Sequence, residues 1–194
     1  MNGTEEKRLE ALRFALNEAY MLGMMAVMAA VLTAALVIQY GAGELPCPLC
    51  LLQRVAMLGV CFGLMLNFRH GSSERNLGFS LLFSVFLLVV AVRQTLLDIY
   101  PRPGHAYVGT AVLGLHMPVW SVLIAVALIA AIALKLCIIG TETARPPPAR
   151  GSLFGRLSTV LSLYLIGLAL VNFGSVVVQC GVGQCHTTGY ALLG

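Results

Sequence analysis

Long apolar runs, separated by short charged stretches, dominate the pattern of hydrophobic and polar positions along this chain. A helix needs about 20 apolar residues to cross the hydrocarbon layer of a bilayer. Cutting the chain at its charges gives five such runs, and polar residues follow no regular period within them. Because isolated strands cannot satisfy their backbone groups in lipid, we expect five helices. The runs are Tyr20–Tyr40, Leu45–Phe68 (helical from about residue 50), Asn76–Ile99, Val112–Leu134 and Leu157–Gln179.

Composition places the chain in the membrane class and excludes several others. Of its 194 residues, 59% are hydrophobic and only 10% are charged, and the mean hydropathy is +0.89. A soluble domain carries roughly 25% charged residues, so a soluble enzyme and a disordered chain are excluded. The formal net charge of +4 is too small for a nucleic-acid-binding surface. We therefore expect one all-α integral membrane domain over residues 1–194.

The basic residues predict which side of the membrane each end of the chain occupies. Nine Lys and Arg residues lie before the first run, between the second and third, and between the fourth and fifth: Lys7, Arg8, Arg13, Arg69, Arg75, Lys135, Arg145, Arg150 and Arg156. Of the segments on the other side, only Tyr100–Met117 holds a basic residue, Arg102. Cytoplasmic loops carry the excess of Lys and Arg. The amino terminus is therefore expected in the cytoplasm and the carboxyl terminus in the periplasm.

Two segments admit alternative interpretations. The first run could be a signal peptide, but its apolar part would then be about 7–15 residues long. Here it follows a long charged leader and continues from Tyr20 to Tyr40, so we expect it to stay as a span. The outer segment Tyr100–Met117 is apolar in its second half but too short to cross, and we expect a short helix or a hooked loop along the interface.

Four of the six cysteines are expected on the outer side of the membrane. Cys61 lies in the middle of the second run and Cys137 at the cytoplasmic end of the fourth span, and both are expected to be packing residues. The other four are Cys47, Cys50, Cys180 and Cys185. They allow three pairings, of which the local one joins Cys47 to Cys50 and Cys180 to Cys185. The outer face of a bacterial membrane is where disulfides persist.

The first pair lies in the motif LPCPLCLLQR, at the start of the second span. Pro48 suits the first turn of a helix, which puts Cys50 at the helix N-terminus, where the backbone N–H groups and the dipole favour a thiolate. Arg54, four residues further on, projects from the same face as Cys50. This arrangement is typical of a redox-active pair. The alternatives are a static disulfide and a four-thiolate zinc site with His186 adjacent.

The second pair encloses two glycines in CGVGQC and follows the fifth span directly. A flexible disulfide next to a helix-anchored one could pass electrons inward from a soluble partner by thiol–disulfide exchange. A simple loop disulfide is the alternative.

Two arginines are expected within the membrane at similar depths, about 6 Å for Arg54 and about 10 Å for Arg93, at 1.5 Å per residue. Intramembrane arginines usually face a cavity or a partner, so both could line one polar pocket. The alternatives are snorkelling to the headgroups and pairing with Asp98. Gln53 and Gln94 add hydrogen-bonding groups nearby. His116, at the outer start of the fourth span, could donate to a carbonyl group or lie in the interface.

Three stretches resemble the DsbB family of inner-membrane thiol–quinone oxidoreductases: Glu44–Arg54 (ELPCPLCLLQR), Leu97–Pro103 (LDIYPRP) and Leu113–Trp120 (LGLHMPVW). The resemblance implies a four-helix bundle that binds ubiquinone or menaquinone near the outer surface. It also implies reoxidation of DsbA, a soluble thioredoxin-like dithiol oxidase. By motif match, Cys50 is the thiol next to the quinone, Cys47 is its partner, and Arg54 stabilises the quinone and the thiolate.

The chain departs from this family in one respect. Typical members carry a second cysteine pair between the third and fourth spans, where Tyr100–Met117 has none. We expect the fifth span to supply Cys180 and Cys185 instead. The predicted function is a membrane thiol oxidase with catalytic Cys47, Cys50, Cys180 and Cys185 and with Arg54, Arg93, Gln53 and His116 towards the quinone. The alternatives are a quinol-driven reductive conduit, a non-catalytic bundle with structural disulfides or zinc, and a vitamin K epoxide reductase relative.

Overall fold

The computed structural model describes residues 3–43, 45–99, 111–138, 147–149, 151–181 and 183, and within these ranges it consists of five long helices. Each helix is long and apolar enough to cross a membrane, which confirms the predicted all-α fold with five spans. In chain order the helices are α1 (Gly3–Gly41), α2 (Pro48–His70), α3 (Glu74–Ile99), α4 (Met117–Ile138) and α5 (Leu153–Cys180).

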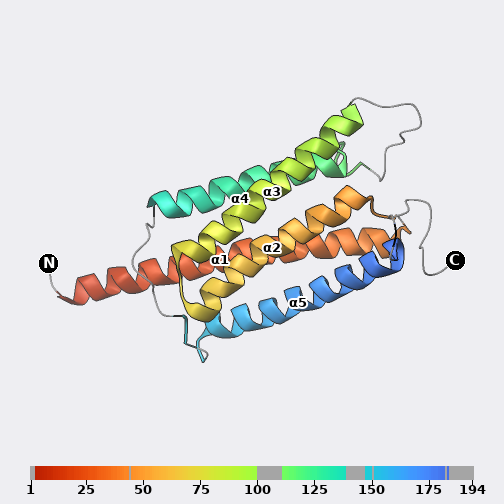
Figure 1. Ribbon diagram of the computed structural model, residues 1–194. Helices are drawn as coiled ribbons and strands as arrows, with labels where there is room; N and C mark the ends of the chain where they lie inside the picture. Colours follow the sequence, from red (N-terminus) through yellow and green to blue (C-terminus); the bar gives the residue numbers. More distant parts are fainter. Residues whose placement is uncertain are drawn as a thin grey trace.

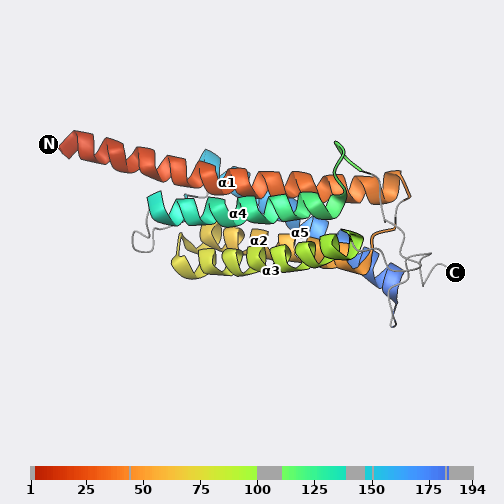
Figure 2. The same cartoon turned by 90° about the horizontal axis from the view of Figure 1, so that it is seen from above.

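Successive helices run in opposite directions, so the bundle has two distinct ends (Figure 1). The end of α1, the start of α2, the end of α3, the start of α4 and the end of α5 gather at one end, and the amino terminus lies at the other (Figures 1 and 2). We call the first of these the cysteine end, because it contains Cys47, Cys50 and Cys180. The basic residues Lys7, Arg69, Arg75, Lys135 and Arg156 lie on or next to the opposite ends of the helices.

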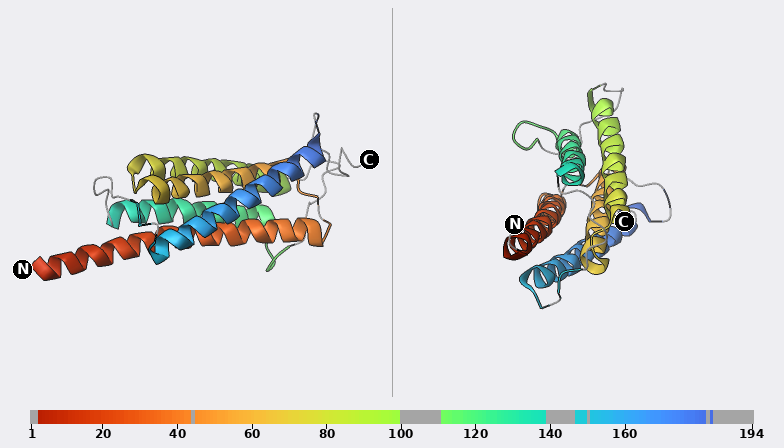
Figure 3. Two further views of the ribbon diagram at one scale, coloured as in Figure 1. Left: turned by 90° about the horizontal axis from the view of Figure 1, so that it is seen from below. Right: turned by 90° about the vertical axis from the view of Figure 1, so that its left-hand side faces the viewer.

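The fifth helix packs against the first two rather than against the fourth. α2 packs along α3, and α3 along α4, whereas α5 contacts α1 and α2. Viewed along the bundle, α4 and α5 lie on opposite sides of α1 (Figure 3, right). This arrangement makes α2 a central helix, with α5 against it on one side and α3 on the other.

The interior of the bundle is a methionine-rich apolar core. Met21, Met25, Met28 and Leu32 of α1 are buried at spacings of four, three and four residues, which is the period of one helix face. They pack in one cluster with residues such as Leu64 of α2. Many apolar side chains remain exposed on the outer surface of the helices. An apolar exterior is expected where lipid rather than water is the solvent.

Two glycines bring α2 close to α3. A Cβ atom at Gly59 would collide with the ring of Phe83, and one at Gly63 would collide with the side chain of Ser80. Ser80 Oγ also donates a 3.0 Å hydrogen bond to the carbonyl oxygen of Val60. Small residues at membrane helix interfaces allow such a close approach, and the contact holds α3 beside α2 along its length.

Helix α1 starts 17 residues before the apolar run that begins at Tyr20. Its leader contains Glu, Lys, Arg, Leu and Ala, all of which have high helix propensity. Cutting a sequence at its charges finds only the part of a helix that lies in lipid, so it does not detect this extension.

Helix α4 starts at Met117, five residues after the expected Val112. Residues 112–115 instead form a tight turn, in which the backbones of Val112 and Leu115 pair with each other. Leu113 and Gly114 both have positive φ angles, 52° and 78°, which a helix does not allow. Trp120 Nε1 donates to Val112 O at 3.0 Å and holds the turn against the helix. The rest of the expected hooked segment, residues 100–110, lies outside the described residues.

Candidate functional site

A disulfide between Cys47 and Cys50 forms the start of α2. Cys47 is the N-cap, with extended backbone angles, and Pro48 occupies the first helical position, where no N–H group is needed. Cys47 Sγ accepts a 3.0 Å hydrogen bond from the backbone N–H of Cys50, so it caps the helix as a serine oxygen would. Both cysteines are half-buried. The start of the helix therefore holds the pair in place without burying it completely.

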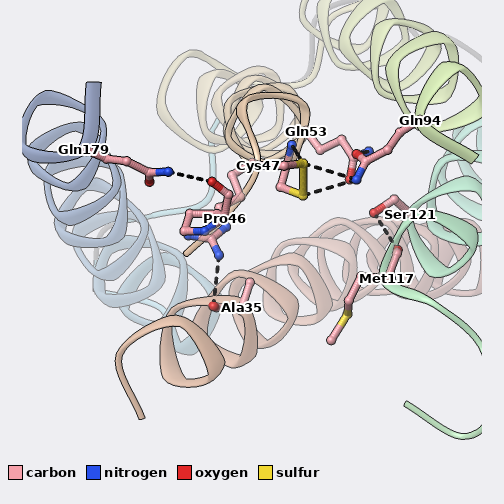
Figure 4. The surroundings of a disulfide bond; sticks show 10 residues. Ala35, Pro46, Cys47, Gln53, Gln94, Met117, Ser121 and Gln179 are labelled. Atoms are coloured by element: carbon pink, nitrogen blue, oxygen red, sulfur yellow. Dashed lines mark hydrogen bonds between the residues drawn. A yellow bond between two sulfur atoms is a disulfide. The ribbon is translucent and has the colours of Figure 1, made fainter. Parts of the chain in front are cut away.

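Gln94 of α3 contacts this disulfide, and Gln53 of α2 in turn contacts Gln94 (Figure 4). Gln94 Nε2 lies 3.2 Å from Cys47 Sγ and 3.3 Å from Cys50 Sγ. Gln53 Nε2 of α2 donates to Gln94 Oε1 at 2.8 Å, which fixes the orientation of the Gln94 amide. Both glutamines are buried. The sulfur atoms are thus presented with an oriented amide donor in an apolar environment.

Arg54 lies one turn beyond Cys50 on α2 and is buried, with 9% of its surface exposed. Its guanidinium donates to Gln39 Oε1, and Nη2 donates to the carbonyl oxygen of Ala35 at 3.0 Å, both on α1. These two acceptors are neutral. Arg54 therefore supplies a positive charge near the disulfide that the acceptors do not cancel.

Helix α5 joins the site through two polar residues one turn apart. Ser175 Oγ accepts a 2.6 Å hydrogen bond from Gln39 Nε2, and Gln179 Nε2 donates to the carbonyl oxygen of Pro46 at 2.7 Å. Figure 4 shows Gln179 reaching across to Pro46 beside Cys47. Because Cys180 follows Gln179, and Cys47 follows Pro46, this bond brings the two cysteine segments to one place.

Cys180 is the last residue of α5 and is buried and disulfide-bonded. Cys185 lies outside the described residues, so the pairing of Cys180 with Cys185 stays a prediction. Cys61 and Cys137 are free cysteines, the first buried within α2 and the second exposed near the end of α4.

The remaining predicted site residues have different positions. Arg93 is exposed on α3 while Arg54 is buried against α1, and it is Gln94 rather than Arg93 that reaches the disulfide. His116 is half-buried just before α4, where its carbonyl oxygen accepts a 3.0 Å hydrogen bond from the N–H of Val119. Neighbouring residues of a helix point about 100° apart, so Arg93 and Gln94 project in different directions from α3.

Sequence reasoning missed the roles of Gln39, Ser175 and Gln179, and it treated Gln94 only as a nearby hydrogen-bonding group. A signal for the α5 residues was present. Asn172, Ser175 and Gln179 follow one another at spacings of three and four residues in the second half of α5, which is otherwise apolar, and all three are buried. Polar side chains on one face of a membrane helix usually contact another helix.

The fold and this geometry define a multi-pass membrane protein with an accessible disulfide at a helix start, next to a buried arginine. Residues 17–135 match the family described as disulfide bond formation protein DsbB, and the chain belongs to this family. It is 35% identical over 91 residues to disulfide bond formation protein B of Aromatoleum aromaticum (strain DSM 19018 / LMG 30748 / EbN1). That match covers 44% of this chain and 54% of the relative. No solved structure matches. Helix α5 and Cys180 lie beyond the residues that match the family.

Proposed function

We propose that this protein is a thiol–quinone oxidoreductase, which reoxidises a periplasmic DsbA-like thioredoxin-fold protein and passes the electrons to ubiquinone or menaquinone. The observation that carries the proposal is the half-buried Cys47–Cys50 disulfide at the start of α2, one turn from the buried guanidinium of Arg54. The nucleophile in thiol–disulfide exchange is a thiolate, and a helix N-terminus with a nearby cation stabilises it. Membership of the DsbB family supports disulfide formation as the biological outcome.

The two cysteines of α2 have different proposed roles. Cys50 Sγ lies in the first turn of the helix, on the face that carries Arg54, and is proposed to pass electrons to the quinone. Cys47 is proposed to exchange with the second cysteine pair. The hydrogen bond between Gln179 and Pro46 supports this division, because it holds the end of α5 beside the residue that precedes Cys47.

The proposed reaction proceeds in three steps, two thiol–disulfide exchanges and one oxidation. The reduced dithiol of the partner attacks the Cys180–Cys185 disulfide, which leaves the partner oxidised and both cysteines as thiols. These two thiols reduce the Cys47–Cys50 disulfide and form their own disulfide again. Two electrons and two protons then leave Cys47 and Cys50 for the quinone, and the first disulfide is restored.

The groups around Arg54 fit a ligand that has carbonyl oxygens. A guanidinium has five N–H donors. Among the described residues, Gln39 Oε1 and the carbonyl oxygen of Ala35 are the acceptors for Arg54, which leaves N–H donors for a ligand. When bound, a quinone supplies the two-electron acceptor, and the protein supplies its placement. Arg54 is the residue proposed to hold it, and Gln53, Arg93 and His116 are proposed as further contributors.

The proposed location is the bacterial inner membrane, with the cysteine end on the periplasmic side. The described basic residues that flank the spans favour the cytoplasm for the opposite end of the bundle. An oxidising compartment at the cysteine end is also where a disulfide can exchange with secreted proteins.

A coupled assay tests the proposal. Full-length protein in nanodiscs is mixed with a short-chain ubiquinone and a reduced DsbA-type protein, and quinol formation is followed by absorbance. We expect steady quinol formation by the natural protein and by Cys137→Ala, which removes an exposed cysteine away from the site. Cys50→Ala should form none. Quinol formation that persists in Cys50→Ala would refute the assigned role.

Two further measurements separate the alternatives. Trapping the partner's thiols in cells shows whether the partner is kept oxidised, as proposed, or reduced, as a quinol-driven conduit requires. Thiol trapping on the protein itself shows whether Cys47 and Cys50 exchange. A pair that never exchanges would favour a structural disulfide.

A further inference from the structure

We propose that Ser175 of α5 is a positioning residue for Arg54 and acts through Gln39. The inference rests on the proposed function, because Arg54 is the residue proposed to hold the quinone. It extends that function by giving the fifth helix a second role, in addition to carrying Cys180.

Ser175, Gln39 and Arg54 form a continuous chain of buried hydrogen bonds across three helices, which we call the relay. Gln39 of α1 lies in the middle, with 1% of its surface exposed. Its Nε2 donates to Ser175 Oγ at 2.6 Å, and its Oε1 accepts from Arg54 Nη1. Both ends of one amide group are therefore engaged, by α5 at one end and by α2 at the other.

Ser175 holds the end of the Gln39 amide that faces away from the arginine. A guanidinium has donors only, so it needs the amide oxygen and is repelled by the amide NH₂ group. The arginine therefore sets the orientation of the amide, and the oxygen of Ser175 accepts from the NH₂ group at the other end, which holds the Gln39 side chain in position. Without that acceptor the buried NH₂ group loses its hydrogen bond, and Oε1 is held less firmly against Arg54. In an apolar interior few other partners are available to replace the lost bond.

Ser175 differs in position from two other residues of α5 whose side chains form hydrogen bonds. Tyr164 OH and Thr33 Oγ1 also join α5 to α1, at 2.7 Å, but they lie three turns away from Ser175. Ser158 Oγ donates to Gly155 O of its own helix at 3.1 Å and reaches no other helix. Tyr164→Phe and Ser158→Ala are therefore matched controls. The first removes a bond between α1 and α5, and the second removes a buried serine hydroxyl.

The test measures equilibrium binding of ubiquinone-1 to full-length oxidised protein in nanodiscs. We expect Ser175→Ala to raise the Kd for quinone about threefold to fivefold, because a change of that size corresponds to the loss of one hydrogen bond of ordinary strength. Ser175→Thr, which keeps the hydroxyl group, should bind as the natural protein does, and so should Tyr164→Phe and Ser158→Ala. In a Gln39→Leu background, Ser175→Ala should have no further effect, because the relay is already broken.

Two results would overturn the inference. One is unchanged binding in Ser175→Ala, and the other is an equal loss with and without the glutamine, which would mean that Ser175 acts on its own. If the natural protein binds no quinone, the proposed function fails, and the relay is then judged by a measurement that needs no ligand. ¹⁵N NMR of the arginine side chains, with Arg54 assigned by Arg54→Lys, should show faster guanidinium rotation in Ser175→Ala. An unchanged rotation rate would contradict the relay.

Discussion

Replacing Gln94 should change the reduction potential of the Cys47–Cys50 pair. The Gln94 amide donates to both sulfur atoms, at 3.2 and 3.3 Å, and Gln53 keeps it oriented. In the disulfide these are hydrogen bonds to neutral sulfur. In the reduced pair one sulfur can be a thiolate, and a hydrogen bond to a charged group is stronger than one to a neutral group. The amide therefore stabilises the reduced form more than the oxidised form.

The size of the effect follows from this difference. Hydrogen bonds to charged groups contribute about 1.5–3 kcal/mol and neutral ones about 0.5–1.5 kcal/mol, so the reduced form gains about 1 kcal/mol more. For a two-electron couple, 30 mV corresponds to about 1.4 kcal/mol. Gln94→Leu should therefore make the potential more negative by about 20 mV, which means a weaker oxidant.

The assay equilibrates the protein with defined mixtures of oxidised and reduced glutathione, and alkylation measures the fraction of reduced Cys47. Cys180 and Cys185 are replaced by alanine, so that only one pair titrates. Thr95→Val is the matched control, because Thr95 Oγ1 bonds, among the described residues, to the Ala91 carbonyl oxygen of its own helix and not to the disulfide. An unchanged or more positive potential in Gln94→Leu would mean that the Gln94 amide does not stabilise the reduced pair.

Three other predictions concern α5 and the packing of the bundle. Cys180→Ala should abolish oxidation of the protein partner but leave quinone-dependent oxidation of dithiothreitol, and loss of both rates would contradict separate roles for the two pairs. Gln179→Leu should slow electron transfer between the two cysteine pairs about threefold to fivefold, because it removes the hydrogen bond to Pro46. Quenched-flow alkylation measures this rate, and an unchanged rate would mean that the hydrogen bond does not position the two pairs. Gly63→Ala should destabilise the bundle by about 1–3 kcal/mol through its collision with Ser80, as judged by unfolding in mixed micelles. At Gly78 an added Cβ atom would meet no atom of another described element within 4 Å, so Gly78→Ala should not destabilise the bundle.

The five spans could be predicted from the sequence because each one needs an apolar run of bilayer length. The start of α2 could be predicted as well, because it depends on local geometry. Pro48 marks the first turn, and the four-residue spacing between Cys50 and Arg54 places both on one face. These features involve neighbours along the chain, and they require no knowledge of how the helices pack.

The contacts between helices could not be predicted in the same way. In a soluble bundle, polar residues mark the outward face of each helix, but here both the core and the lipid-facing surface are apolar. Rotation of a helix about its axis is then hard to infer from hydropathy. For this reason the sequence did not distinguish exposed Arg93 from buried Gln94, nor did it predict that Arg54 would bond to Gln39.

A single-turnover experiment tests directly whether the Cys47–Cys50 pair passes its electrons to a quinone. Fully reduced protein is mixed anaerobically with one equivalent of short-chain ubiquinone, and quinol and disulfide are both counted, in a variant with alanine at positions 180 and 185. We expect one quinol for each Cys47–Cys50 disulfide formed, and none when Cys50 is also replaced by alanine. Disulfide formation without quinol, or quinol formation without Cys50, would contradict this expectation.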